Sequence, residues 1–79
     1  MNTRKPMAAH IVAAEEVTKG EVHFTVEAYD ALQGKSFTGI VKVIDGMPLG
    51  HFIKPGKSPL SPMCLQIVKA AVLNAHNSK

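Results

Sequence analysis

Apolar and polar residues alternate strictly over residues 21–29 of the chain. The apolar positions of this segment are Val22, Phe24, Val26 and Ala28. A period of two places these four side chains on one face of an extended segment and the polar side chains on the other. The pattern therefore predicts an antiparallel strand with one buried face and one face in water.

Two more strands are expected after the loop at residues 30–35. Ser36–Ile44 is the first, and Gly39 in its middle indicates a bulge or a close backbone approach. Its apolar face carries Phe37, Val41 and Val43. Asp45-Gly46 is a hairpin signal, and Met47–Ile53 follows as a short last strand. Because Pro48 cannot donate a ladder hydrogen bond, this strand should be irregular or lie at an edge.

The C-terminal part of the chain predicts one helix, from about Ser61 to Ala75. Ser61 is suited to cap free amides and Pro62 to occupy the first turn. A broad apolar face follows at helical spacing, formed by Cys64, Leu65, Ile67, Val68, Ala71, Val72 and Ala75. We therefore expect an α+β fold, in which an antiparallel sheet of three or four strands is covered on one face by this helix.

The segment from His10 to Thr18 fits two structures. Ile11, Ala14 and Val17 fit a short helix face, whereas Ile11, Ala13 and Val17 fit alternate positions of a strand. Alanine and glutamate favour the helix by propensity. A strand is favoured by position, because Lys19-Gly20 would then turn directly into the next strand, and we interpret the segment as a strand.

Length limits the chain of 79 residues to a single domain over 1–79, with a loose basic tail over 1–7. No apolar run approaches the roughly 20 residues that a membrane span needs. The single cysteine cannot form a disulfide within the chain, which fits a reducing compartment, so we expect a cytoplasmic protein. Charge is uneven: residues 15–30 hold five acids and one lysine, whereas residues 46–79 hold four lysines and no acid. An acid-free basic end attracts polyanions and acidic protein surfaces.

Candidate catalytic chemistry is sparse. The four histidines lack the helical spacing of a paired metal site. Cys64 lies on the apolar helix face, where a cysteine acts as a small hydrophobe. We therefore expect no catalytic residue, no metal and no cofactor, and a protein that is not an enzyme. A small enzyme with a pocket at an oligomer interface is the third function that we consider, after the two binding functions described below.

The expected helix also has a narrower outer stripe, formed by Met63, Gln66, Ala70, Leu73 and Asn77. Exposed apolar side chains in such a stripe indicate a contact patch for a partner or for a second copy in a homodimer. The loop before the helix adds two lysines. The predicted partner-binding residues are Lys54, Lys57, Met63, Ala70 and Leu73.

From Phe24 onward, the order strand, strand, strand, basic loop and helix resembles the C-terminal part of double-stranded RNA-binding domains. Phe24–Glu27, Val43–Gly46 and Leu49-Gly50 resemble the strand region of that family. Lys54 and Lys57 fall near the position of its phosphate-binding loop. The resemblance implies direct nucleic-acid binding. However, residues 58–63, the first turn of the expected helix, lack the lysine cluster that the family carries there.

The whole chain is similar in kind to small proteins of phages and mobile elements, including inhibitors of the anti-CRISPR type. This resemblance rests on small size, missing catalytic groups, uneven charge and the outer helix stripe. It implies a viral, non-enzymatic inhibitor that acts stoichiometrically on a protein, or on a protein–nucleic acid complex, in the host cytosol. We place this function ahead of direct nucleic-acid binding.

Overall fold

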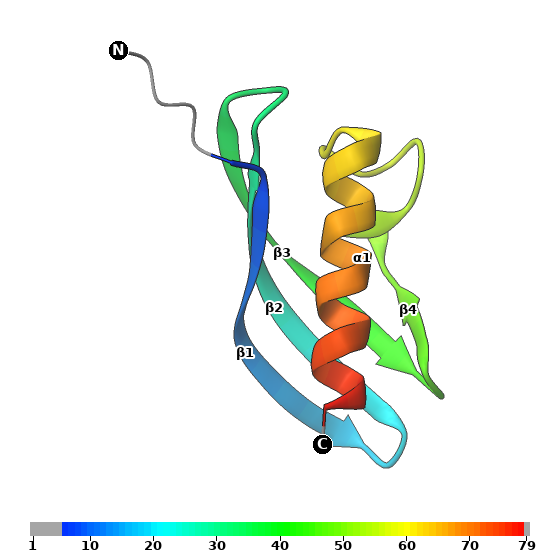
Figure 1. Cartoon of the computed structure of the whole chain (residues 1–79). Helices are drawn as coiled ribbons and strands as arrows, with labels where there is room; N and C mark the ends of the chain where they lie inside the picture. Colours follow the sequence, from blue (N-terminus) through cyan, green and yellow to red (C-terminus); the bar gives the residue numbers. More distant parts are fainter. Residues whose placement is uncertain (1–5, 79) are drawn as a thin grey trace.

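The computed structural model describes residues 6–78 as a four-stranded antiparallel sheet followed by one helix (Figure 1). The elements in chain order are β1 (Ala8–Thr18), β2 (Glu21–Asp30), β3 (Lys35–Ile44), β4 (Met47–Leu49), a 3₁₀ turn η1 (His51–Ile53) and α1 (Pro62–Asn77). The strands lie in the order β1-β2-β3-β4, so each strand pairs with its neighbour in sequence. This arrangement confirms the expected α+β fold.

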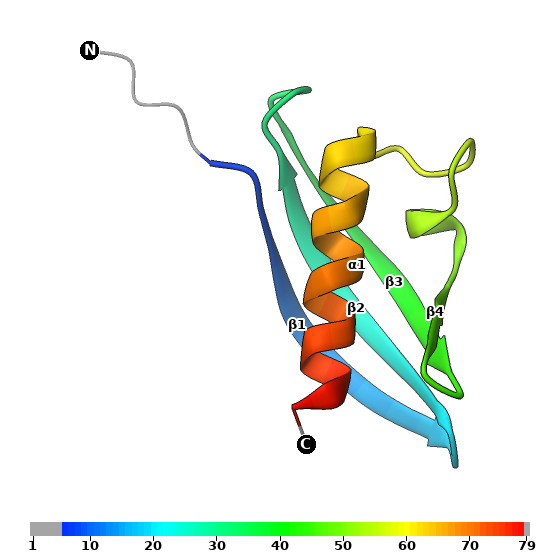
Figure 2. The same ribbon diagram turned by 45° about the vertical axis from the view of Figure 1, so that its right-hand side comes forward.

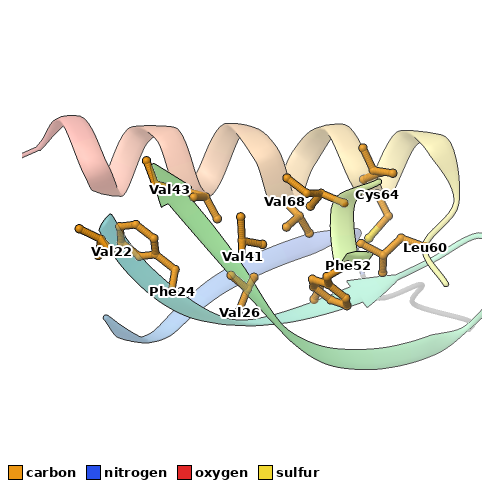
Figure 3. Close-up of a cluster of buried hydrophobic side chains, with 13 residues drawn as sticks. Val22, Phe24, Val26, Val41, Val43, Phe52, Leu60, Cys64 and Val68 are labelled. Carbon is orange, nitrogen blue, oxygen red and sulfur yellow. The ribbon is translucent and has the colours of Figure 1, made fainter. Parts of the chain in front are cut away.

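The core lies between one face of the sheet and α1 (Figure 3). The alternating apolar residues of β2 are all buried, and they pair in unbroken register with those of β3, where Val41 and Val43 are also buried. From the helix, Cys64, Leu65, Val68 and Val72 close the core. Within residues 6–78 no helix covers the opposite face of the sheet, and we call it the open face (Figure 2).

Gly39 marks a close approach, as the sequence indicated, and not a bulge. The pairing of β2 with β3 shows no register shift there. Instead the ring of Phe52 lies against the glycine, and a Cβ added at Gly39 would come within 2.4 Å of ring atoms. The missing side chain thus lets η1 pack directly onto β3.

β1 confirms the strand interpretation of residues 10–18, but its alternation is broken twice. Register shifts occur between Ile11 and Ala13 and between Glu16 and Thr18. Each shift leaves one extra valine, Val12 or Val17, outside the regular pairing. As a result Ile11 lies on the side of α1 whereas Ala13 lies on the open face, so the expected common face does not form.

The expected last strand over Met47–Ile53 is wrong in its second half. Asp45 and Gly46 have positive φ values of 51° and 82°, which form the predicted hairpin turn. β4 ends at Leu49, and the chain turns at Gly50, where φ is 130°. Phe52 and Ile53 are both buried. Two consecutive strand residues point to opposite faces, so burying both requires the 3₁₀ turn instead.

The helix begins where the sequence predicted and ends two residues later. Ser61 is the N-cap, and its side chain accepts a hydrogen bond from the amide of Cys64, with Pro62 in the first turn. α1 packs over β1 and β2, while η1 contacts both α1 and β3. Residues 1–5 of the predicted loose tail lie outside the described residues. Met7, at the end of that tail, packs against the core.

Candidate functional site

The open face carries an apolar patch where β3 meets β4. Pairing places Ile44 beside Met47, and Lys42 beside Leu49, all on this face. Three of the apolar side chains are strongly exposed: Ile40 by 54%, Met47 by 61% and Leu49 by 42%. We call Ile40, Ile44, Met47 and Leu49 the β3–β4 patch. A contiguous exposed apolar patch of this kind is typical of interaction surfaces.

A basic groove adjoins the β3–β4 patch. It has a volume of about 750 Å³, and its lining includes three residues of the patch together with Phe52 and Pro59. Its polar lining consists of His23, Lys42, His51 and Lys57, and no carboxylate of the described residues lines it. Within the described residues none of these lysines forms an ion pair. An apolar floor with two unpaired lysines at its rim suits an acidic partner surface.

A side-chain hydrogen bond between His23 and Glu21 lies beside this groove. The imidazole Nε2 of His23 is 2.6 Å from a carboxylate oxygen of Glu21, two residues earlier on the open face of β2. Both side chains are about a quarter exposed. The contact holds the His23 ring at the groove wall.

The predicted partner-binding residues do not all meet in one place. Lys57 lines the groove of the open face. Lys54 lines a different groove of about 460 Å³, between the β4–η1 segment and α1, together with Lys69. Met63, at 60% exposure, and the exposed Ala70 lie on the outer face of α1. Leu73 is half-buried, so only part of its side chain is available.

The β3–β4 patch and Lys69 were missed by the sequence reasoning. A signal for half of the patch was present, because Ile40, Lys42 and Ile44 occupy the alternate positions of β3 opposite the buried valines. The other half depends on the pairing of β3 with β4, which brings Met47 and Leu49 beside them.

Asp30 is a structural carboxylate and not a surface acid. Its side chain has no exposed surface. One oxygen accepts hydrogen bonds from the amide of Leu32 and the hydroxyl of Ser61, at 3.1 and 2.9 Å. The other accepts from the side-chain amide of Gln33 and the backbone amide of Ser61, at 2.8 and 2.6 Å. The carboxylate therefore ties the β2–β3 turn to the start of α1.

These contacts determine the pKa of Asp30. Burial raises the pKa, but the hydrogen bonds from Ser61, Gln33 and Leu32 to the charged form outweigh burial and hold the pKa below its ordinary value. Burial, together with the nearby Asp30 carboxylate, raises the pKa of the Cys64 thiol. The thiol donates a long contact of 3.8 Å to the carbonyl of Tyr29. Cys64 is therefore held in its neutral form within the core.

The remaining histidine and acid positions do not build a metal site among residues 6–78, where no three His, Cys, Asp or Glu side chains come together in a metal-binding arrangement. His76 is half-buried and packs edge-on against Phe24, with ring centroids 6.4 Å apart. Its Nδ1 is buried without a hydrogen-bond partner. The geometry is that of a ring in a core contact.

Comparison with known proteins gave no match: no protein-family model, no curated protein and no solved structure is detectably similar to this chain. The resemblance to double-stranded RNA-binding domains stays a prediction. Where that family has its first helix, the described chain has strand β1. No helix within residues 6–78 combines the length and the apolar character needed to cross a membrane.

Proposed function

We propose that this chain is a non-enzymatic binding protein, which acts stoichiometrically by docking its β3–β4 patch on a macromolecular partner. The exposure of Ile40, Met47 and Leu49 at neighbouring positions of the open face carries this proposal. These side chains are large and adjacent, and α1 packs on the other face of the sheet. Removing them from water against a partner supplies the desolvated centre that holds a complex.

The charges around the patch support an acidic partner surface. Lys42 lies within the patch, and Lys57 and His51 line the adjoining groove, which has no carboxylate in its lining. The first two strands hold five acidic residues: Glu15 and Glu16 lie on β1, and Glu21, Glu27 and the buried Asp30 lie on β2, where Glu21 pairs with Ile44. The unpaired lysines of the groove steer encounter with a surface of the opposite sign.

A protein surface, alone or within a protein–nucleic acid complex, fits the patch better than a bare nucleic acid. Proteins that bind single strands stack bases on exposed aromatic rings. The strongly exposed large apolar residues of the described chain are aliphatic or methionine, and none is aromatic. Inhibition of a host nucleic-acid-processing machine, implied by the resemblance to small phage inhibitors, is the form of docking that we favour.

The outer stripe of α1 is the rival surface, supported by the 60% exposure of Met63. A matched pair of double variants separates the two surfaces: Ile40→Ser with Met47→Ser in the patch, and Met63→Ser with Leu73→Ser in the stripe. Tagged wild-type protein and both variants are used for capture from a host lysate, with and without nuclease. Circular dichroism and mass measurement check fold and oligomeric state.

We expect the patch variant to stay folded and to lose the proteins that the wild type captures, while the stripe variant keeps them after nuclease treatment. Loss of capture with the stripe variant alone would move the docking surface to α1. Capture that disappears with nuclease would favour direct nucleic-acid binding instead. A wild-type dimer that becomes a monomer in the patch variant would assign the patch to self-association. Each of these three results would contradict the proposal.

A further inference from the structure

A second groove lies on the other side of the β4–η1 segment, between that segment and α1. It has a volume of about 460 Å³. Its apolar walls include Pro48, Ile53 and Pro55, and its polar lining is His51, Lys54 and Lys69. It shares Leu49, Gly50 and His51 with the groove of the open face, and Leu49 belongs to the β3–β4 patch, but the patch residues Ile40, Ile44 and Met47 do not line it.

Two unneutralised lysines meet in this groove from distant parts of the sequence. Lys54 follows η1, and Lys69 comes from the middle of α1, where it is half-buried. No carboxylate lines the groove, and within the described residues neither ammonium group has an acid within ion-pair distance. A half-buried lysine without a partner concentrates positive potential in a concave site with apolar walls.

Both lysines are held by fixed backbone. The amide of Lys54 donates to the carbonyl of His51 at 3.3 Å, and the carbonyl of Lys54 accepts from the amides of Lys57 and Ser58, both at 2.9 Å. Lys69 follows the fully buried Val68 within the helix. The groove walls are therefore built before any ligand arrives, which lowers the entropic cost of binding.

We propose that this groove binds a phosphate group carried by a larger molecule. Two ammonium groups without a competing acid select an anion, and lysine is a common phosphate ligand. Typical ligand pockets span roughly 300–1,000 Å³, and the volume of this one exceeds what a bare phosphate fills. Pro48, Ile53 and Pro55 offer apolar contact to the rest of the ligand. A nucleotide and the backbone of a polynucleotide are the two sources of such a phosphate that the test distinguishes.

The two lysines of this site lie outside the β3–β4 patch, although Leu49 borders both sites. It also changes the residue pair that the sequence suggested for an anion, because Lys54 shares the groove with Lys69 and not with Lys57. Either proposal can fail while the other holds.

The test is a titration of isotope-labelled protein, followed by NMR, with three probes: inorganic pyrophosphate, AMP, and a single-stranded oligothymidylate of about 12 nucleotides, within the usual site size of strand-binding domains. We expect amide shifts centred on His51, Lys54 and Lys69. Lys54→Gln and Lys69→Gln should each weaken the tightest probe by roughly three- to tenfold, since each removes one partly solvated charge-assisted contact. Lys69→Arg keeps the charge and should keep binding.

Lys35→Gln is the matched control, because it removes the same charge at an exposed position outside both grooves. It should bind within about twofold of the wild type. If Lys69→Gln fails to fold, the test rests on Lys54→Gln, which should weaken binding, and on Lys69→Arg, which should keep it. Tightest binding of AMP assigns a nucleotide, and tightest binding of the oligonucleotide assigns a polynucleotide backbone. The proposal is overturned if none of the probes shifts the groove amides, or if Lys35→Gln weakens binding as much as Lys54→Gln.

Discussion

Asparagine at position 30 would keep the shape of the buried aspartate but could not accept all the hydrogen bonds that the carboxylate accepts. Each carboxylate oxygen of Asp30 accepts one hydrogen bond from a backbone amide, that of Leu32 or that of Ser61. Whichever way an asparagine side chain is turned, its NH2 group faces one of these N–H donors. The hydroxyl of Ser61 and the side chain of Gln33 can reorient, whereas the two backbone amides cannot.

The cost of Asp30→Asn follows from this geometry. One buried backbone N–H loses its acceptor, and the remaining hydrogen bonds become neutral. Hydrogen bonds to charged groups contribute about 1.5–3 kcal/mol, and an unsatisfied buried donor costs about 1–3 kcal/mol. Allowing for reorientation of Gln33 and Ser61, we expect a loss of about 2–4 kcal/mol in the free energy of unfolding. A small domain changes its Tm by about 4–8 °C per kcal/mol, so Tm should fall by roughly 10–30 °C.

Thermal and urea unfolding at neutral pH, followed by circular dichroism, measure this loss. Asp45→Asn is the matched control, because it removes the same charge at an exposed turn position whose positive φ asparagine adopts readily. The control should stay within about 0.5 kcal/mol of the wild type. Equal midpoints for Asp30→Asn and Asp45→Asn would refute the structural role assigned to the buried carboxylate.

Three further predictions concern the same core. The pKa of Asp30 is lowered on folding, so the charged carboxylate should stabilise the fold fully above about pH 4, the ordinary aspartate range. This stabilisation should be lost as pH falls through the folded-state pKa. Asp30→Asn should therefore flatten that part of a profile of unfolding free energy against pH. Gly39→Ala should cost about 1–3 kcal/mol through its clash with Phe52 and much less in a Phe52→Ala background, and additive losses in the double-mutant cycle would disprove the contact. Iodoacetamide should label Cys64 only as fast as the protein unfolds, since the thiol is buried and its pKa raised; rapid labelling of native protein, detected by mass spectrometry, would contradict this.

The elements that could be predicted from the sequence are those set by neighbouring residues. The alternation of apolar and polar residues from Val22 to Ala28 predicts β2 by itself, because it has the period of a strand with one buried face. The start of α1 is equally local, because Ser61 caps the helix and Pro62 fits its first turn. Gly39 was informative for a similar reason, since a glycine inside a strand pattern indicates close packing.

The features that escaped prediction depend on residues far apart in the chain. The break of the last strand arises because Phe52 must reach Gly39, 13 positions earlier, while Ile53 also enters the core. The bulges at Val12 and Val17 fit β1 to β2 and leave no turn residue as a signal. Asp30 meets Ser61 across 31 positions, so its burial cannot be inferred from its place beside a loop.

The candidate site shows the same division. The lysines at 54 and 57 were expected to act together because they are neighbours in one loop. The structure directs them into separate grooves, on either side of the β4–η1 segment. Likewise the exposed apolar side chains of the open face come from two strands. The patch exists only because Met47 and Leu49 pair with Ile44 and Lys42.

Two methionines allow the most direct test of the docking claim. Met47 lies in the β3–β4 patch and is 61% exposed, and Met63 lies on the outer stripe of α1 and is 60% exposed. A photoreactive methionine analogue placed at one position at a time gives two probes of nearly equal accessibility. After irradiation with the captured partner, we expect a cross-link of one chain to one partner from position 47 and little from position 63. Cross-linking mainly from position 63, or equally from both, would contradict docking through the β3–β4 patch.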